Sequence, residues 1–168
     1  EITRKYYPYF FELKIEITLS IATLIFNIEI FNKSNTTMPV NFGLHPYFNI
    51  SDFRNVKFID YAKCCLNQKN NNLVKTENLL KNISTGIDLL MYSTGKTSFI
   101  DYGYQRKITL NNPSPFDTAV IWSEPSRQML CMEPWTSPRN SLVNGFRKIE
   151  IMPNSSQKLY TSILVENL

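Results

Sequence analysis

Apolar and polar side chains alternate along residues 11–20 with the period of two that is typical of a β-strand. One face of this stretch carries Phe, Leu and Ile side chains, and the other carries Glu, Lys, Thr and Ser. Residues 24–30 repeat the pattern after a short break, and the turn-forming residues 32–35 follow. The two stretches therefore predict a β-hairpin in which each strand has one buried and one solvated face.

Further short strand-like runs, separated by turn-forming residues, make up the remainder of the chain. No long amphipathic helix, internal repeat or domain linker interrupts them. The pattern predicts an all-β sandwich or barrel, with residues 1–168 as a single domain or part of one. The expected elements are strands at 56–66, 98–110, 119–122, 128–132, 148–152 and 158–165, a short helical or irregular piece at 76–82, and a firm turn at 111–115.

Composition narrows the class of protein. The 168 residues suffice for one hydrophobic core, and the aromatic content of 13% suits a β-rich fold. The net charge of +4 comes from scattered Lys and Arg, which argues against a nucleic-acid groove. No apolar stretch approaches the roughly 20 residues that span a bilayer, and we find no signal peptide, so we expect no membrane partner.

Cysteine usage points to a reducing compartment. The three cysteines form neither a CxxC pair nor a Cys/His cluster, so we expect no disulfide framework and no zinc site. These observations predict a cytoplasmic protein without a bound metal.

The single histidine of the chain lies within residues 41–49, Asn-Phe-Gly-Leu-His-Pro-Tyr-Phe-Asn. At strand period the apolar side chains of this stretch fall on one face. Asn41, Gly43, His45 and Tyr47 fall on the other, where amide, imidazole and phenol groups lie beside a backbone left bare by glycine. This polar face suits a ligand that is rich in hydroxyl groups.

An acid–base partner for His45 is best sought among carboxylates in apolar surroundings. Glu133 ends an apolar run and is followed by Pro134 and Trp135, a setting that can desolvate the carboxylate and raise its pKa into the range of a general base. Asp88 is an isolated carboxylate among apolar neighbours. The alternative is structural: a lone histidine is often a satisfied packing residue, and a glutamate before proline often closes a turn.

Two motifs carry a family resemblance. Residues 42–49 resemble the histidine motif of the aldose 1-epimerase (galactose mutarotase-like) family, and residues 130–136, Leu-Cys-Met-Glu-Pro-Trp-Thr, resemble its glutamate motif. Both occur in the family's order. Weaker likeness covers nearly the whole chain, at residues 7–13, 32–39, 87–88 and 151–156.

The resemblance implies a galactose mutarotase-like β-sandwich (a supersandwich), of which this chain would be the C-terminal part. It implies interconversion of the α and β anomers of a free hexose, with Glu133 as general base and His45 as general acid, and without a cofactor. Asp88 and Asn41 would then bind sugar hydroxyls, and Tyr47 or Trp135 would stack on the sugar ring.

Departures from the family pattern qualify this interpretation. An arginine and a histidine of the family's N-terminal half have no counterpart here, so we expect the missing half, or a second copy of the chain, as a partner. Arg139-Asn140 stands where many relatives have an acidic residue. Two alternatives remain open: a non-catalytic carbohydrate-binding sandwich, and a hexose-phosphate mutarotase, which would need clustered arginines.

Overall fold

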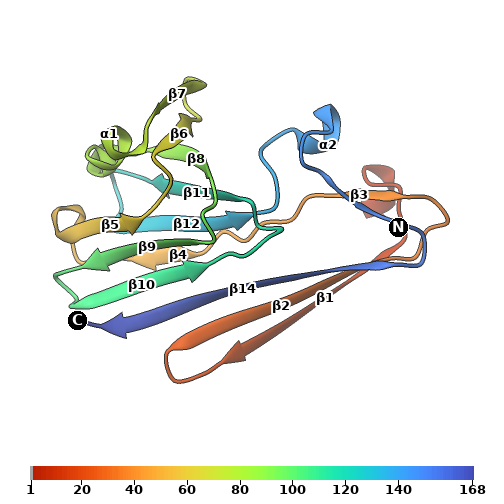
Figure 1. The fold of residues 1–168 in the computed structure, drawn as a ribbon, viewed down its shortest axis with the longest axis horizontal. Helices are drawn as coiled ribbons and strands as arrows, with labels where there is room; N and C mark the ends of the chain where they lie inside the picture. The colour runs from red at the N-terminus through yellow and green to blue at the C-terminus, as the bar shows by residue number, and fades with distance from the viewer. Residues whose placement is uncertain (1) are drawn as a thin grey trace.

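The computed structural model describes residues 2–168 as two stacked antiparallel sheets of six strands each, with a separate two-stranded ribbon (Figure 1). The first sheet has the order β1 (Phe11–Leu19), β2 (Thr23–Asn32), β14 (Ser156–Asn167), β10 (Arg106–Asn111), β9 (Lys96–Asp101), β5 (Val56–Asp60). The second has the order β4 (Tyr47–Asn49), β12 (Met129–Trp135), β11 (Thr118–Ser123), β8 (Asp88–Tyr92), β6 (Cys64–Asn67), β7 (Asn72–Lys75). The ribbon pairs β13 (Ile149–Ile151) with β3 (Met38–Val40).

Helical structure is confined to single turns. Two short α-helices, α1 (Thr76–Leu80) and α2 (Ser141–Asn144), and three 3₁₀ turns, Thr3–Lys5, Phe53–Asn55 and Ile83–Thr85, connect the strands. No helix among residues 2–168 is long and apolar enough to cross a membrane. The three cysteines are free thiols.

The main core fills the space between the two sheets, and it fixes which way β12 faces. Leu130 and Met132 of β12 are fully buried members of this core, together with Ile121 of β11 and Phe99 of β9. Because side chains alternate along a strand, Cys131 and Glu133 must lie on the opposite face of the second sheet. That face carries the candidate site.

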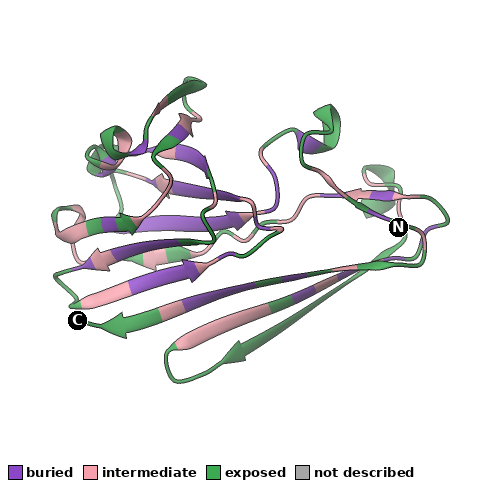
Figure 2. Ribbon diagram, in the orientation of Figure 1, coloured by how far each residue is buried: buried purple, intermediate pink, exposed green. Residues whose placement is uncertain are grey.

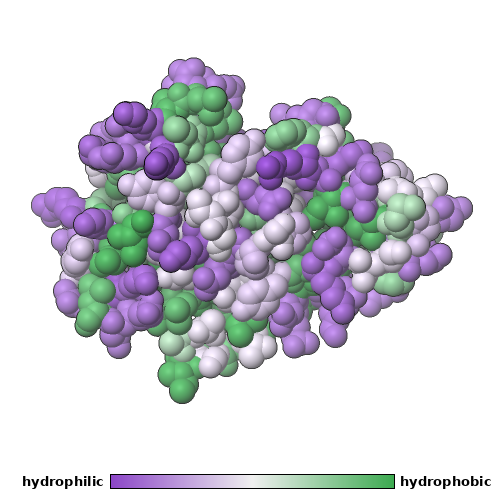
Figure 3. Space-filling model, viewed as in Figure 1, coloured by the Kyte–Doolittle hydropathy of each residue, from purple (hydrophilic) through white to green (hydrophobic). Residues whose placement is uncertain are grey.

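The predicted hairpin is confirmed, but the predicted burial of its first strand is wrong. β1 and β2 pair from Phe11 opposite Asn32 to Leu19 opposite Leu24. Ile28 is 2% exposed, whereas its partner Ile15 on the same face is 42% exposed, and every residue of β1 is exposed (Figure 2). Hydrophobic side chains also gather at the exposed tip of this hairpin, at the bottom of Figure 3.

The apolar face of β1 continues the core-facing side of β2. Tyr7 meets the Phe11 ring edge-on and Leu13 borders a pocket, yet every residue of β1 stays exposed. Alternation predicted correctly which side chains share a face, and could not show whether anything packs against them.

Two predicted strands are each two strands in the structure. Residues 56–66 divide into β5 and β6, which belong to different sheets, because the chain crosses from one layer to the other between them. Residues 98–110 form the hairpin of β9 and β10, since the carboxylate of Asp101 accepts hydrogen bonds from the backbone N–H groups of Gly103 and Tyr104 and turns the chain. The runs at 119–122, 128–132, 148–152 and 158–165 are strands β11 to β14, as predicted.

A matched pair of mutations tests the difference in burial between β1 and β2. We expect Ile15→Thr to cost about 0.5 kcal/mol of unfolding free energy or less and to shift the isolated chain toward monomer, because it removes exposed apolar surface. Ile28→Thr, its partner across the hairpin, should cost about 2 kcal/mol or more, since it leaves a hydroxyl in the core. Urea unfolding and sedimentation velocity measure the two effects, and equal losses of stability would contradict the burial described here.

Candidate active site

The histidine and glutamate motifs lie side by side at one end of the second sheet. Beyond the pairing of β4 with β12, the Leu44 N–H donates to the Pro134 carbonyl (3.2 Å) and the Thr136 N–H donates to the Phe42 carbonyl (2.9 Å). The Phe42 N–H in turn donates to Thr136 Oγ1 (2.9 Å). These bonds join segments about ninety residues apart in the sequence, and they hold His45 against Glu133.

A row of functional side chains crosses the face of the sheet that points away from the main core. Tyr47 of β4 is opposite Cys131 of β12, Cys131 is opposite Trp122 of β11, and Trp122 is opposite Asp88 of β8. Glu133 lies in the next row, opposite the buried Val120. Strand register therefore places a carboxylate, two aromatic rings and a thiol beside Glu133.

His45 and Glu133 are in direct contact. His45 Nε2 is 3.3 Å from Glu133 Oε1, and the side chain of His45 is 52% exposed whereas that of Glu133 is 1% exposed. The imidazole stacks on the Tyr47 ring at 5.0 Å between centroids, and it meets the edge of Trp122 at 6.3 Å. His45 is thus accessible to a ligand from solvent, whereas Glu133 is buried.

Burial dominates the electrostatics of Glu133. The pKa of its carboxyl is raised to about 7, and loss of solvation is the largest cause. A hydrogen bond from the Trp135 indole N–H to Oε2 (3.0 Å) lowers the pKa, the nearby charge of Asp88 raises it, and the charge of Arg139 lowers it. Burial, together with the charge of Glu133, also raises the pKa of the Cys131 thiol to about 12. A carboxyl with a pKa near 7 can accept and return a proton at neutral pH.

Asp88 lies two strands away from Glu133 and is held by two donors. Gln68 Nε2 donates to its Oδ1 (2.7 Å), and Arg139 lies 3.4 Å from its Oδ2. Arg139 thus faces an acidic partner on β8. The sequence did not indicate either Gln68 or this pairing.

Asn41 and Trp135 line a cavity of about 350 Å³ together with His45 and the segment 137–140. The side-chain oxygens Asn41 Oδ1 and Ser137 Oγ are buried without a hydrogen-bond partner among residues 2–168. The amide oxygen of Asn41 can only accept a hydrogen bond, whereas the Ser137 hydroxyl can accept or donate one. Neither Tyr47 nor Asp88 lines this cavity. The predicted residues therefore fall into two groups: one in the cavity, and one along the sheet face beside it.

Cys131 is the residue of this site that sequence reasoning missed. Ligand atoms of His45, Cys131 and Glu133 all lie within 4.8 Å of one another, a set that could hold a metal ion. The geometry alone assigns no metal to this set. The signal that could have found Cys131 is its spacing of two from Glu133, which puts both on one face.

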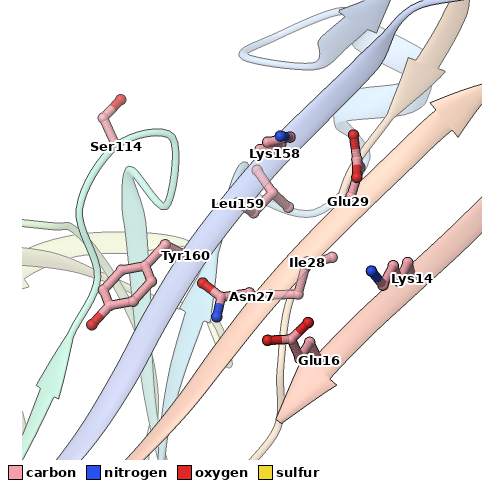
Figure 4. Close-up of a pocket in the computed structure, with 9 residues that line it drawn as sticks. All are labelled: Lys14, Glu16, Asn27, Ile28, Glu29, Ser114, Lys158, Leu159 and Tyr160. Carbon is pink, nitrogen blue, oxygen red and sulfur yellow. The ribbon is translucent and has the colours of Figure 1, made fainter. Parts of the chain in front are cut away.

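A larger hollow of about 430 Å³ lies on the outer face of the first sheet, over β1, β2 and β14 (Figure 4). Lysine and glutamate side chains of both signs surround it, among them Lys14, Glu16 and Lys158. None of the predicted site residues contributes to it. The hollow is a mixed-charge surface and is separate from the His45–Glu133 pair.

Comparison with known proteins settles the family. The family model described as aldose 1-epimerase matches residues 2–163. The chain belongs to the aldose 1-epimerase family. No curated protein matches it.

Solved structures show the same fold. The Slr1438 protein of Synechocystis sp. PCC 6803 is 28% identical, with a TM-score of 0.95 over 100% of this chain and 59% of its own. A galactose mutarotase-like protein of Clostridium acetobutylicum is 21% identical, with a TM-score of 0.81 over 100% of this chain and 60% of its own. A galactose mutarotase related enzyme of Lactobacillus acidophilus is 20% identical, with a TM-score of 0.76 over 99% of this chain and 65% of its own.

These likenesses confirm the galactose mutarotase-like β-sandwich that the sequence predicted. The chain spans about three fifths of the length of the first structural relatives that it matches (59% and 60%). The roles of individual site residues stay predictions.

Ionisation of Glu133 within this family fold should cost stability. Its pKa is raised from 4.5 to about 7, so the folded state binds more protons than the unfolded state between these values, and stability falls as pH rises through that window. We expect Glu133→Gln to stabilise the chain relative to the parent by on the order of 3 kcal/mol more at pH 8 than at pH 4.5.

Urea unfolding at the two pH values measures this difference. The exposed Glu150→Gln is the matched control, and it should show almost no pH-dependent gain. A gain for Glu133→Gln that is the same at both pH values would contradict the raised pKa of the buried Glu133 carboxyl.

Proposed function

We propose that this chain carries the proton-transfer pair of an aldose 1-epimerase, which interconverts the α and β anomers of a free hexose. The observation that supports this most directly is the 3.3 Å contact between His45 Nε2 and the buried Glu133 Oε1 on the open face of the second sheet. The pair joins an exposed imidazole to a carboxylate with a pKa of about 7.

In the proposed reaction, the Glu133 carboxylate takes the proton of the sugar C1 hydroxyl while the His45 imidazolium gives a proton to the ring oxygen. The bond between C1 and the ring oxygen breaks, and an open-chain aldehyde forms. After rotation about the C1–C2 bond, the ring oxygen attacks the other face of the aldehyde and both protons move back. Each group returns to its starting state, so the reaction consumes no cofactor or co-reactant.

The remaining predicted residues would bind the sugar. Asn41, whose Oδ1 lacks a partner among residues 2–168, and Asp88 offer acceptors for hydroxyl groups. The Tyr47 ring lies beside the imidazole, where it can pack on the apolar face of the sugar ring.

The arginines favour a free sugar over a sugar phosphate. Within the described part of the chain Arg54, Arg127 and Arg147 pair with Asp52, Glu124 and Asp117. Arg4 and Arg106 lie over the rings of Phe10 and Tyr104, and Arg139 lies against the site residue Asp88. A phosphate group would be bound by several converging cations, and these arginines do not converge.

Full activity, we propose, requires the part of the family sandwich that this chain does not span. The Slr1438 protein is covered over only 59% of its length, and the apolar face of β1 is exposed here. We therefore expect the isolated chain to be weakly active and poorly soluble. The cytoplasmic location stays a prediction from cysteine usage.

Anomer exchange tests the function. NMR of freshly dissolved α-glucose and α-galactose should show faster conversion when the chain is fused to the segment of the Slr1438 protein that it does not cover. Glu133→Gln in this fusion should lower the enzymatic rate by about 1,000-fold or more while the sugar still binds, because the base is lost and the shape is kept.

Exposed Glu16→Gln is the control and should leave the rate unchanged. Exchange at the parent rate in Glu133→Gln would refute the assignment of the base. Sugar binding without any acceleration in the parent fusion would instead identify a carbohydrate-binding protein.

A further inference from the structure

Gly43 is a glycine because a tryptophan ring occupies the space of its side chain. A Cβ atom built at Gly43 would lie 2.7 Å from Trp135 Cδ1, closer than Cβ atoms approach other atoms in proteins, and 3.2 Å from Trp135 Nε1, which is a tight contact. The backbone of Gly43 is not in the left-handed region, so its conformation does not demand glycine. An isolated bridge pairs the two residues across the strands. What demands glycine here is the indole.

The same indole holds one oxygen of Glu133. Trp135 and Glu133 are two residues apart on β12 and share a face, and Trp135 Nε1–H donates to Glu133 Oε2 at 3.0 Å. The other oxygen, Oε1, is the one that His45 contacts at 3.3 Å. The two carboxylate oxygens thus have different partners on different sides.

We propose that Gly43 and Trp135 are positioning residues for Glu133: Gly43 seats the indole, and the indole N–H fixes Oε2, so that Oε1 is the oxygen that exchanges a proton. The catalytic consequence rests on the proposed function, whereas the arrangement itself does not. The assignment differs from a sugar-stacking role for Trp135, because the indole face that lies on Gly43 is closed to a ligand.

The chain has two tryptophans, which makes the arrangement measurable without any activity. In ¹⁵N-labelled protein, the Trp135 indole N–H resonance should shift between pH 5 and pH 9 with a midpoint of about 7, as its acceptor ionises. The Trp122 resonance serves as a comparison in the same spectra, because its ring meets His45 at 6.3 Å while its indole N–H makes no hydrogen bond to Glu133 among residues 2–168. The titratable and charged groups around Glu133 are His45, Tyr47, Cys131, Asp88 and Arg139.

Variants separate these groups. Glu133→Gln should abolish the shift of the Trp135 resonance, and His45→Gln should preserve it, which shows that the carboxylate is the titrating group. Gly43→Ala should displace the indole, move its N–H proton upfield and reduce its pH response at least by half. A Trp135 resonance that does not respond to pH in the parent, or that responds equally in Glu133→Gln, overturns the proposal.

The kinetic consequence uses Trp135→Phe, which keeps a ring and removes the donor. Loss of this hydrogen bond raises the pKa of Glu133, so the acidic limb of the anomer-exchange profile should move to higher pH, and kcat at pH 7 should fall about 10-fold with KM changed less than about twofold. A change in KM alone, with kcat and the pH profile intact, would overturn the proposal in favour of sugar stacking. If no form of the protein accelerates exchange, the proposed function fails, and the indole resonance still decides the positioning role.

Discussion

Strand β12 buries one face in the core between the two sheets and carries the candidate site on the other face. The site depends on this division of the strand. Leu130 and Met132 are fully buried between the sheets, and each contributes roughly 1.5–3 kcal/mol by leaving water. Cys131 and Glu133 alternate with these two residues along the strand, so their side chains must face the other side of the sheet. A one-residue slip of β12 would move Glu133 into the core and Met132 onto the site. Burial of the two apolar residues thus specifies where the carboxylate points.

Strand β12 also carries Glu133, whose buried charged form lowers the stability of the fold. Glu133 is 1% exposed, and its charged form is disfavoured by burial and by the charge of Asp88. Its partners offset this cost only in part: one indole N–H at Oε2, and an imidazole at Oε1. A buried carboxylate with few donors is poorly stabilised as an anion, and for that reason it holds and releases a proton near pH 7. Packing of the core on the other face of β12 offsets the stability that the buried Glu133 carboxylate costs.

Much of the fold and of the site was predictable from the sequence, because it depends on local pattern and on residue type. Period-two alternation identified the β1–β2 hairpin and the C-terminal strands, and the apolar residues that flank Glu133 in the sequence indicated a raised pKa. The change of sheet between β5 and β6 was not predictable, since alternation reports which side chains share a face and not which sheet a strand joins. The exposure of β1 was missed for a related reason: burial depends on what packs opposite, and that partner is not encoded in the strand itself.

The contacts described above that place His45 against Glu133 lie within this chain. Leu44 bonds to Pro134, Gly43 seats Trp135, and Trp135 holds Glu133. The cavity beside His45 is less complete: Asn41 Oδ1 and Ser137 Oγ have no partner among residues 2–168, and the cavity is open. The chain spans 59% of the Slr1438 protein, and closure of this cavity by the rest of the family fold stays a proposal. Removal of water from such a site strengthens every charge interaction within it, so enclosure would also raise the effect of a pair that is already in place.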